Sequence, residues 1–186
     1  MSEDLLIYHC APTLANLKTG SLFSCSYESM EKLKEEIQYF NHLLVPKGIR
    51  ILPLQCKKGR ALIYLYRPVR LEQDFADTSR CRLLRERGYQ EENATRCIME
   101  LMKRLKCESE FPHEIGLFLG YPTEDVQGFI ENQAEGSKLI GYWKVYGDEE
   151  NARQLFSRYK KCTDAYCRQR AKGKSIAQLT VPNRKR

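Results

Sequence analysis

The segment from Ala61 to Tyr66 reads Ala-Leu-Ile-Tyr-Leu-Tyr, and it constrains the fold more than any other part of the chain. A strand that is apolar at every position is buried on both faces, so it belongs in the middle of a sheet. Ile49 to Cys56 precedes it across Lys57-Lys58-Gly59, a turn signal that predicts a hairpin. Pro53 lacks a backbone donor, which places Ile49–Cys56 at a sheet edge or at a bulge.

Two further strands are predicted, at Ser21–Tyr27, where apolar residues alternate, and at Leu139–Tyr146. Apolar residues at helical spacing separate and follow the strands. The expected helices are Asp4–Tyr8, Pro12–Leu17, Ser29–Leu44, Phe75–Arg87, Glu91–Lys106, two short helices at 112–119 and 123–132, and a long final helix at 148–173. This order matches the βαββαβ pattern. We therefore predict an α+β fold with an antiparallel four-stranded sheet of the ferredoxin-like type and several added helices.

The positive charge of the chain is concentrated at its C-terminal end. The formal net charge is +7, yet residues 158–186 contain ten Lys or Arg and a single acid, Asp164. We predict one globular α+β domain over residues 1–173, since 186 residues allow a sizeable core, and a basic, flexible tail over 174–186. Such an end can attract nucleic acid, an anionic surface or an acidic partner. A solvated helix end is the plainer interpretation.

The composition limits location and chemistry. The acidic start Met-Ser-Glu-Asp predicts no secretory signal, and no apolar run is long enough for a transmembrane segment, so a cytoplasmic protein is expected. Its eight cysteines are then reduced, and they contain no Cys-x-x-Cys pair, which excludes zinc ribbons and thioredoxin-type motifs. Walker A, G-x-G-x-x-G, H-E-x-x-H and G-x-S-x-G motifs do not occur either. Whether the protein is an enzyme is left open.

The most unusual stretch, residues 112–148, combines glycine, proline and aromatic residues. It contains Pro-His-Glu-Ile-Gly-Leu-Phe-Leu-Gly-Tyr-Pro, then Glu-Asp-Val and Gly-Phe-Ile-Glu-Asn, then Gly-Tyr-Trp-Lys-Val-Tyr-Gly-Asp. Together with His-Cys-Ala-Pro-Thr-Leu at 9–14, and Tyr-Lys-Lys-Cys at 159–162 followed by Cys167, these motifs resemble an uncharacterised domain-of-unknown-function family of anaerobic, clostridial-type bacteria. The resemblance covers nearly the whole chain and implies no established activity.

The same stretch contains the main candidate site. No hydrophobic core needs the side chains of His113 and Glu114, so we expect them on the rim of a pocket. Tyr121, Tyr142 and Trp143 are the candidate ligand-binding residues, because their rings form an apolar wall with polar tips. Such a pocket suits a small planar or anionic ligand. We therefore predict a small-ligand, metal or redox-cofactor binding or regulatory protein, whose cofactor is unknown.

Two alternatives use cysteine. If the Ala-Pro pair after Cys10 starts a helix, the Cys10 thiol has a lowered pKa, and with His113 and Glu114 it forms the site of a thiol-dependent enzyme. Cys10, His113 and Cys167 are also the candidate metal ligands, because thiolate and imidazole suit iron or zinc. Cys162 is read as a core residue, because five residues along a helix leave it roughly 140° away from Cys167.

Nucleic-acid binding through the basic C-terminus is the third alternative. A βαββαβ sheet is also found in the RNA-recognition module, but that module needs aromatic residues where Arg60 and Leu62 stand. Without them the stacking on bases is lost. The helix expected at Thr123–Asn132 contains acids and no Lys or Arg, so phosphate would repel it from DNA. The predicted partners are thus an unknown small ligand or protein, with nucleic acid as the alternative.

Overall fold

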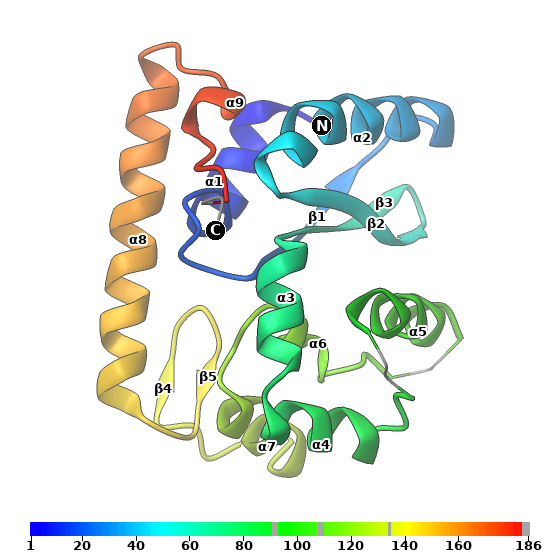
Figure 1. Cartoon of the computed structure of the whole chain (residues 1–186), viewed down its shortest axis with the longest axis vertical. Coiled ribbons are helices and arrows are strands. Elements are labelled where there is room, and N and C mark those ends of the chain that lie inside the picture. The colour runs from blue at the N-terminus through cyan, green and yellow to red at the C-terminus, as the bar shows by residue number, and fades with distance from the viewer. Residues whose placement is uncertain (91–92, 108–109, 134, 184–186) are drawn as a thin grey trace. The chain divides into compact units, whose positions relative to one another are not determined.

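The computed structural model describes residues 1–90, 93–107, 110–133 and 135–183. The chain divides into two compact units (Figure 1). Unit 1 comprises Met1–Val69 and Tyr159–Arg186, and unit 2 comprises Arg70–Arg158. Among the described residues, each helix is too short or too polar to span a membrane. The cytoplasmic location stays a prediction.

Unit 1 is built on an antiparallel three-stranded sheet with the strand order β1-β3-β2. Its elements are α1 (Glu3–Leu14), β1 (Gly20–Ser26), α2 (Met30–Leu44), the 3-10 helix η1 (Val45–Lys47), β2 (Arg50–Lys57), β3 (Arg60–Tyr66), the part of α8 (Glu149–Ala171) from Tyr159 onward, and α9 (Ile176–Leu179). The apolar β3 pairs with both neighbours, and β2 is an edge strand with a register shift between Pro53 and Gln55. Both features agree with the sequence, since the missing donor of Pro53 is tolerated at a bulge.

Helices α1 and α2 cover one face of this sheet (Figure 1). The core that they form contains Leu6, Ile7, Cys10 and Leu14 of α1, Leu33, Ile37, Phe40 and Leu44 of α2, Phe23, Cys25, Ile51, Ala61, Ile63 and Leu65 of the sheet, and Ile49 and Ile176. Burying each large apolar side chain contributes roughly 1.5–3 kcal/mol before the entropy of ordering it is counted. This contiguous core is what holds unit 1 together.

Where two helices were expected near the start of the chain, α1 is a single helix. Ser2 caps it, since its hydroxyl accepts from the backbone N–H of Leu5 at 3.2 Å. Pro12 lies in the last turn of α1, where its missing N–H removes only one helical hydrogen bond. The helix expected at 75–87 is α4 (Thr78–Glu86), which begins three residues later because the Asp77 side chain caps it. A separate helix that was not expected, α3 (Pro68–Phe75), precedes it.

Arg67 follows β3 and is fully buried in unit 1. Its guanidinium donates to the backbone carbonyls of Thr13 at 2.7 Å, Leu14 at 2.8 Å and Val181 at 2.7 Å, and to the side-chain oxygen of Asn183 at 2.8 Å. These bonds fix residues 181–183 to the end of α1. The division into a domain at 1–173 and a flexible tail at 174–186 stays a prediction.

Unit 2 is mainly helical. It contains most of α3, all of α4, and then α5 (Ala94–Cys107), α6 (Ile115–Phe118), α7 (Thr123–Glu131), β4 (Leu139–Ile140), β5 (Lys144–Val145) and the part of α8 up to Arg158. Its α6 and α7 are joined by a turn in which Gly120 has a φ of 76°, a conformation that favours glycine. This turn brings the polar start of α7 back beside α6.

The predicted four-stranded ferredoxin-like sheet is wrong. The described residues form the three-stranded sheet of unit 1 and a separate two-stranded sheet, β4–β5, in unit 2. The segment Leu139–Tyr146 folds back on itself, so that Leu139 pairs with Val145. A Cβ atom on Gly141 would lie 2.2 Å from the Phe156 ring, so only glycine fits this tight turn. The α+β class holds, while the fourth strand of the expected sheet is a local hairpin.

Candidate functional site

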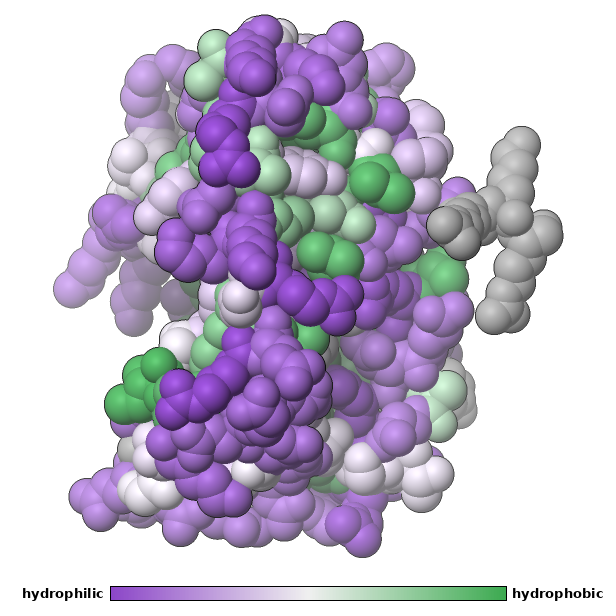
Figure 2. All heavy atoms as spheres, turned by 90° about the vertical axis from the view of Figure 1, so that its left-hand side faces the viewer, coloured by the Kyte–Doolittle hydropathy of each residue, from purple (hydrophilic) through white to green (hydrophobic). Residues whose placement is uncertain are grey.

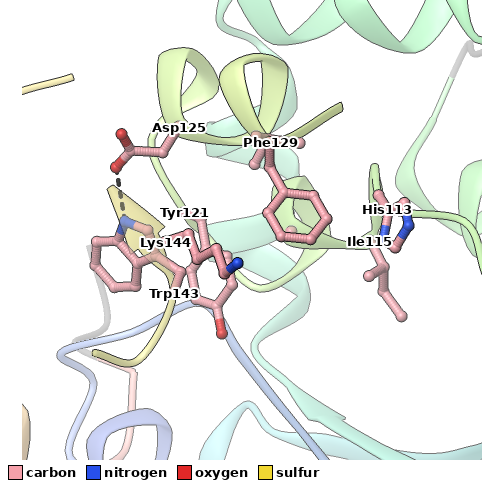
Figure 3. Close-up of a pocket in the computed structure, with 9 residues that line it drawn as sticks. His113, Ile115, Tyr121, Asp125, Phe129, Trp143 and Lys144 are labelled. Carbon is pink, nitrogen blue, oxygen red and sulfur yellow. Dashed lines mark hydrogen bonds between the residues drawn. The ribbon is translucent and has the colours of Figure 1, made fainter. Parts of the chain in front are cut away.

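A pocket of about 180 Å³ lies within unit 2, between the region of α6, helix α7 and the β4–β5 hairpin (Figure 3). Most of its lining is apolar or aromatic. The lining residues are His113, Ile115, Gly116, Tyr121, Asp125, Val126, Phe129, Trp143 and Lys144. All of them come from the stretch of residues 112–148 that was most unusual in the sequence.

Aromatic rings form two walls of this pocket. On one side Tyr121 stacks on Trp143, with ring centroids 4.7 Å apart and an interplanar angle of 28°. On the other side the His113 ring meets the edge of Phe129 at 4.8 Å. In Figure 3, Phe129 projects between His113 and the Tyr121–Trp143 pair. Ring faces and edges of this kind prefer other planar groups as neighbours.

Gly116 lines the pocket and has no room for a side chain. A Cβ atom there would lie 2.7 Å from Val126 and 3.2 Å from the Tyr121 ring. Both neighbours also line the pocket, so a larger residue at this position would displace the wall itself. The glycine of α6 is therefore explained by close packing against α7.

Asp125, in the first turn of α7, is the buried polar centre of the site. One carboxylate oxygen accepts from the indole N–H of Trp143 at 2.6 Å, and the other accepts from the backbone N–H groups of Tyr146 at 2.7 Å and Gly147 at 2.8 Å. Three donors thus compensate the loss of water around a buried carboxylate. Asp125 attaches the β4–β5 hairpin to α7 and fixes the orientation of the Trp143 ring.

The two basic side chains of the pocket are those of Lys144 and His113. The Lys144 ammonium lies 6.0 Å from the centre of the Phe129 ring. His113 is exposed, and its ring also lies 5.9 Å from that of Phe111. A ligand in the pocket would therefore meet aromatic walls first and positive or neutral nitrogen groups at the edge.

Glu114 is directed into unit 2 and does not line the pocket. Its carboxylate accepts from the Tyr89 hydroxyl at 2.9 Å and lies 3.7 Å from the Arg104 guanidinium, which in turn covers the Tyr89 ring at 4.5 Å. Burial, and then the negative charge of Glu114, raise the pKa of Tyr89. Glu114 therefore connects the region after α4 to α5 and α6.

Cys10 and Cys167 belong to unit 1, whereas His113 belongs to unit 2. Cys10 lies inside α1, away from its N-terminus, and it is fully buried. Burial raises the pKa of its thiol to about 12, the reverse of the lowered pKa that a nucleophile needs. Cys167 packs against the core of unit 1. Among the residues described, no group of three or more His, Cys, Asp or Glu side chains has an arrangement that could hold a metal ion.

Of the residues named from the sequence, His113, Tyr121 and Trp143 line the pocket and Tyr142 does not. The Tyr142 ring is exposed, while its carbonyl accepts from the Tyr121 hydroxyl at 3.2 Å. Sequence reasoning missed the lining residues Ile115, Gly116, Asp125, Val126, Phe129 and Lys144. The signal that could have found Asp125 is the nearby Trp143, because a buried tryptophan needs a hydrogen-bond acceptor for its indole N–H.

Residues 6–180 match the family described as Protein of unknown function (DUF3793). The match confirms the predicted resemblance to an uncharacterised family, and the link to anaerobic bacteria stays a prediction. No curated protein and no solved structure shows significant similarity to the chain.

Proposed function

We propose that this chain, which belongs to the family of unknown function DUF3793, binds a small single-ring anion in the pocket of unit 2. The proposal is carried by one observation. Aromatic side chains from three neighbouring segments surround a pocket that Lys144 also lines. The Asp125 carboxylate beside them already accepts three hydrogen bonds from the protein. The ligand enters between the Tyr121–Trp143 pair and the Phe129–His113 pair.

The size of the pocket limits the ligand. A cavity of roughly 150 Å³ holds one benzene molecule, and drug-sized sites begin at roughly 300 Å³. At about 180 Å³ this pocket takes one six-membered ring with a small substituent. A fused multi-ring cofactor would need its remaining rings outside the aromatic walls.

The charges favour an anionic substituent. All three hydrogen bonds to Asp125 come from protein donors, so its charge is already compensated inside the fold. The Lys144 ammonium at the edge attracts a carboxylate or phosphate and repels a cation. A ligand of about nine non-hydrogen atoms that uses these contacts would bind with a Kd of about 0.1–1 mM.

Amide shifts of isotope-labelled protein, titrated with benzoate, test this function. We expect saturable shifts at lining residues such as Gly116, Phe129 and Trp143. Lys144→Met should weaken binding about 5-fold or more, because it removes the attracting charge. Lys106→Met is the matched control, since it removes the same charge from an exposed position of unit 2 outside the pocket and should bind benzoate normally. Shifts confined to other residues would contradict the proposal.

A thiol-dependent reaction at Cys10 is the weaker candidate. Nothing supports activation of this thiol, because it is buried within α1 and its pKa is raised to about 12. Cys107 is exposed and serves as an internal comparison. With iodoacetamide at neutral pH, Cys107 should react and Cys10 should stay unmodified until the protein unfolds. Faster reaction at Cys10 than at Cys107 would revive the enzyme alternative.

A further inference from the structure

Within unit 1, α8 has two distinct sides. Tyr159 is buried, and Tyr166 and Cys167 are half-buried against the core. Lys161 and Arg168 are exposed, and so is Lys172 directly after the helix. Positions 161, 168 and 172 are spaced by seven and four residues, which places them within roughly 40° of one another if the helical geometry continues through 172. We call these three residues the basic stripe. Figure 2 faces α8 and shows hydrophilic side chains along it.

The cations of the basic stripe differ from their neighbours on α8 in their ion pairs. Two neighbouring cations form ion pairs within the protein. Arg170 contacts Glu3 at 2.7 Å and Asp4 at 3.0 Å, and Lys160 contacts Asp164 at 3.0 Å. No described acidic residue forms an ion pair with Lys161, Arg168 or Lys172. Unit 1 carries 18 Lys and Arg against 7 Asp and Glu, a net charge of +11, so the stripe lies in a strongly positive unit.

The residues between these cations indicate which partner fits. Asp164, Ala165 and Ala171 occupy neighbouring positions and provide no large apolar side chain. A helix that binds a membrane surface needs an apolar face, and a protein interface needs aromatic or apolar anchors. A nucleic-acid backbone needs only a row of cations that neutralise phosphates.

We propose that the basic stripe of unit 1 binds the phosphate backbone of nucleic acid without reading its sequence. The eleven helical steps of 1.5 Å from 161 to 172 make a stripe of roughly 16 Å. A nucleic-acid strand with a rise of about 3.4 Å per nucleotide places about five phosphates along that length. The contact involves one face of the structured helix α8 and the residue directly after it, not the last residues of the chain. It is independent of the pocket in unit 2.

The test uses the full chain and a short fluorescein-labelled oligouridine, whose anisotropy reports binding at several salt concentrations. The stripe variant combines Lys161→Gln, Arg168→Gln and Lys172→Gln. The matched control combines Lys34→Gln, Arg50→Gln and Lys57→Gln, which removes the same residue types from other exposed positions of unit 1. Circular dichroism verifies that both variants are folded.

We expect the stripe variant to bind about 10-fold more weakly at low salt, with a slope of log K against log salt that is shallower by about 2. The control should stay within about 2-fold of the unchanged protein. Equal losses in both variants would overturn the proposal, because net charge alone would then explain binding. It would also be overturned if the unchanged protein did not bind the oligonucleotide at low salt, or if the three cations were needed only for binding phosphatidylglycerol vesicles.

Discussion

The two units of this chain bury charges of opposite sign. Unit 1 has a net charge of +11 and buries a cation, Arg67, among carbonyl and amide oxygens. Unit 2 has 13 Lys and Arg against 17 Asp and Glu, a net charge of −4, and buries a carboxylate, Asp125, among N–H donors. In both cases neutral dipoles satisfy the buried charge, and the contact joins segments distant in sequence.

The comparison shows why a ligand site is expected in unit 2. In unit 1 a sheet and two long helices fill a contiguous aliphatic core, and Arg67 only secures its end. In unit 2 the region around α6, α7 and the β4–β5 hairpin is held by aromatic stacking and by Asp125. Large flat rings that meet around a fixed carboxylate leave a pocket between them.

Removing the carboxylate of unit 2 should have the largest effect on stability. Asp125→Ala leaves three buried or half-buried N–H donors without their acceptor, and we expect it to cost about 4 kcal/mol of unfolding free energy, measured by urea denaturation. Asp125→Asn keeps one acceptor oxygen and should cost about half as much. Hydrogen exchange should speed up at 139–147 in both variants. Unchanged exchange there would contradict the anchoring role of Asp125.

The corresponding change in unit 1 is Arg67→Met, which should cost about 3 kcal/mol because four oxygen acceptors lose their donor. Its exchange should speed up at 175–183 and at the end of α1, and not at 139–147. The Asp125 variants should show the opposite pattern, with faster exchange at 139–147 and not at 175–183. If both variants loosened the same segments, the chain would not contain two separately stabilised units.

Gly128→Ala sharpens the comparison within unit 2. Replacing a helical glycine by alanine usually stabilises a helix by about 1 kcal/mol. Here the added Cβ atom would lie 2.7 Å from the Cβ atom of Tyr146, which can move only with the backbone of the residue that follows β5. We therefore expect a destabilisation of about 2 kcal/mol in thermal or urea unfolding. A stabilised variant would mean that α7 and the hairpin are not in close contact.

The pH dependence of stability should show a smaller effect, which comes from Lys18 in unit 1. Burial lowers the pKa of Lys18 from 10.5 to about 8. Between those values the unfolded chain binds the extra proton, so the contribution of Lys18 to stability rises with pH across this window. The unfolding free energy of the unchanged protein minus that of Lys18→Met should rise by about 1 kcal/mol per pH unit between pH 8 and pH 10.5. A flat difference would show that Lys18 is solvated in the folded state.

Local patterns predicted much of unit 1. The all-apolar Ala61–Tyr66, the turn at Lys57–Gly59 and the donor missing from Pro53 together specify the central strand, the hairpin and the edge. The segment Leu139–Tyr146 misled because β-branched and aromatic residues, which favour strands, fill most of it. Its hairpin conformation depends on Asp125 of α7, which accepts hydrogen bonds from Trp143, Tyr146 and Gly147. The periodicity of a sequence does not indicate such contacts between segments.

The candidate site was predictable in its location and less so in its members. The density of rings and glycines directed attention to residues 112–148, which contain the pocket. His113 and Glu114 were expected to act together, but they lie in the turn just before α6, where their side chains take different directions. His113 therefore faces the pocket while Glu114 is buried beside Tyr89. The pairing of a thiol with His113 assumed a proximity that sequence alone does not determine.

The central claim, that this pocket binds a single-ring anion, is tested most directly through Trp143. The chain has one tryptophan, and it lines the pocket, so its fluorescence reports on the site alone. Benzoate, benzamide and benzamidinium share one planar shape and differ in charge. We expect saturable changes with affinity falling in that order, and the preference for benzoate should disappear in Lys144→Met. The absence of any saturable change, or tighter binding of benzamidinium than of benzoate, would contradict the account.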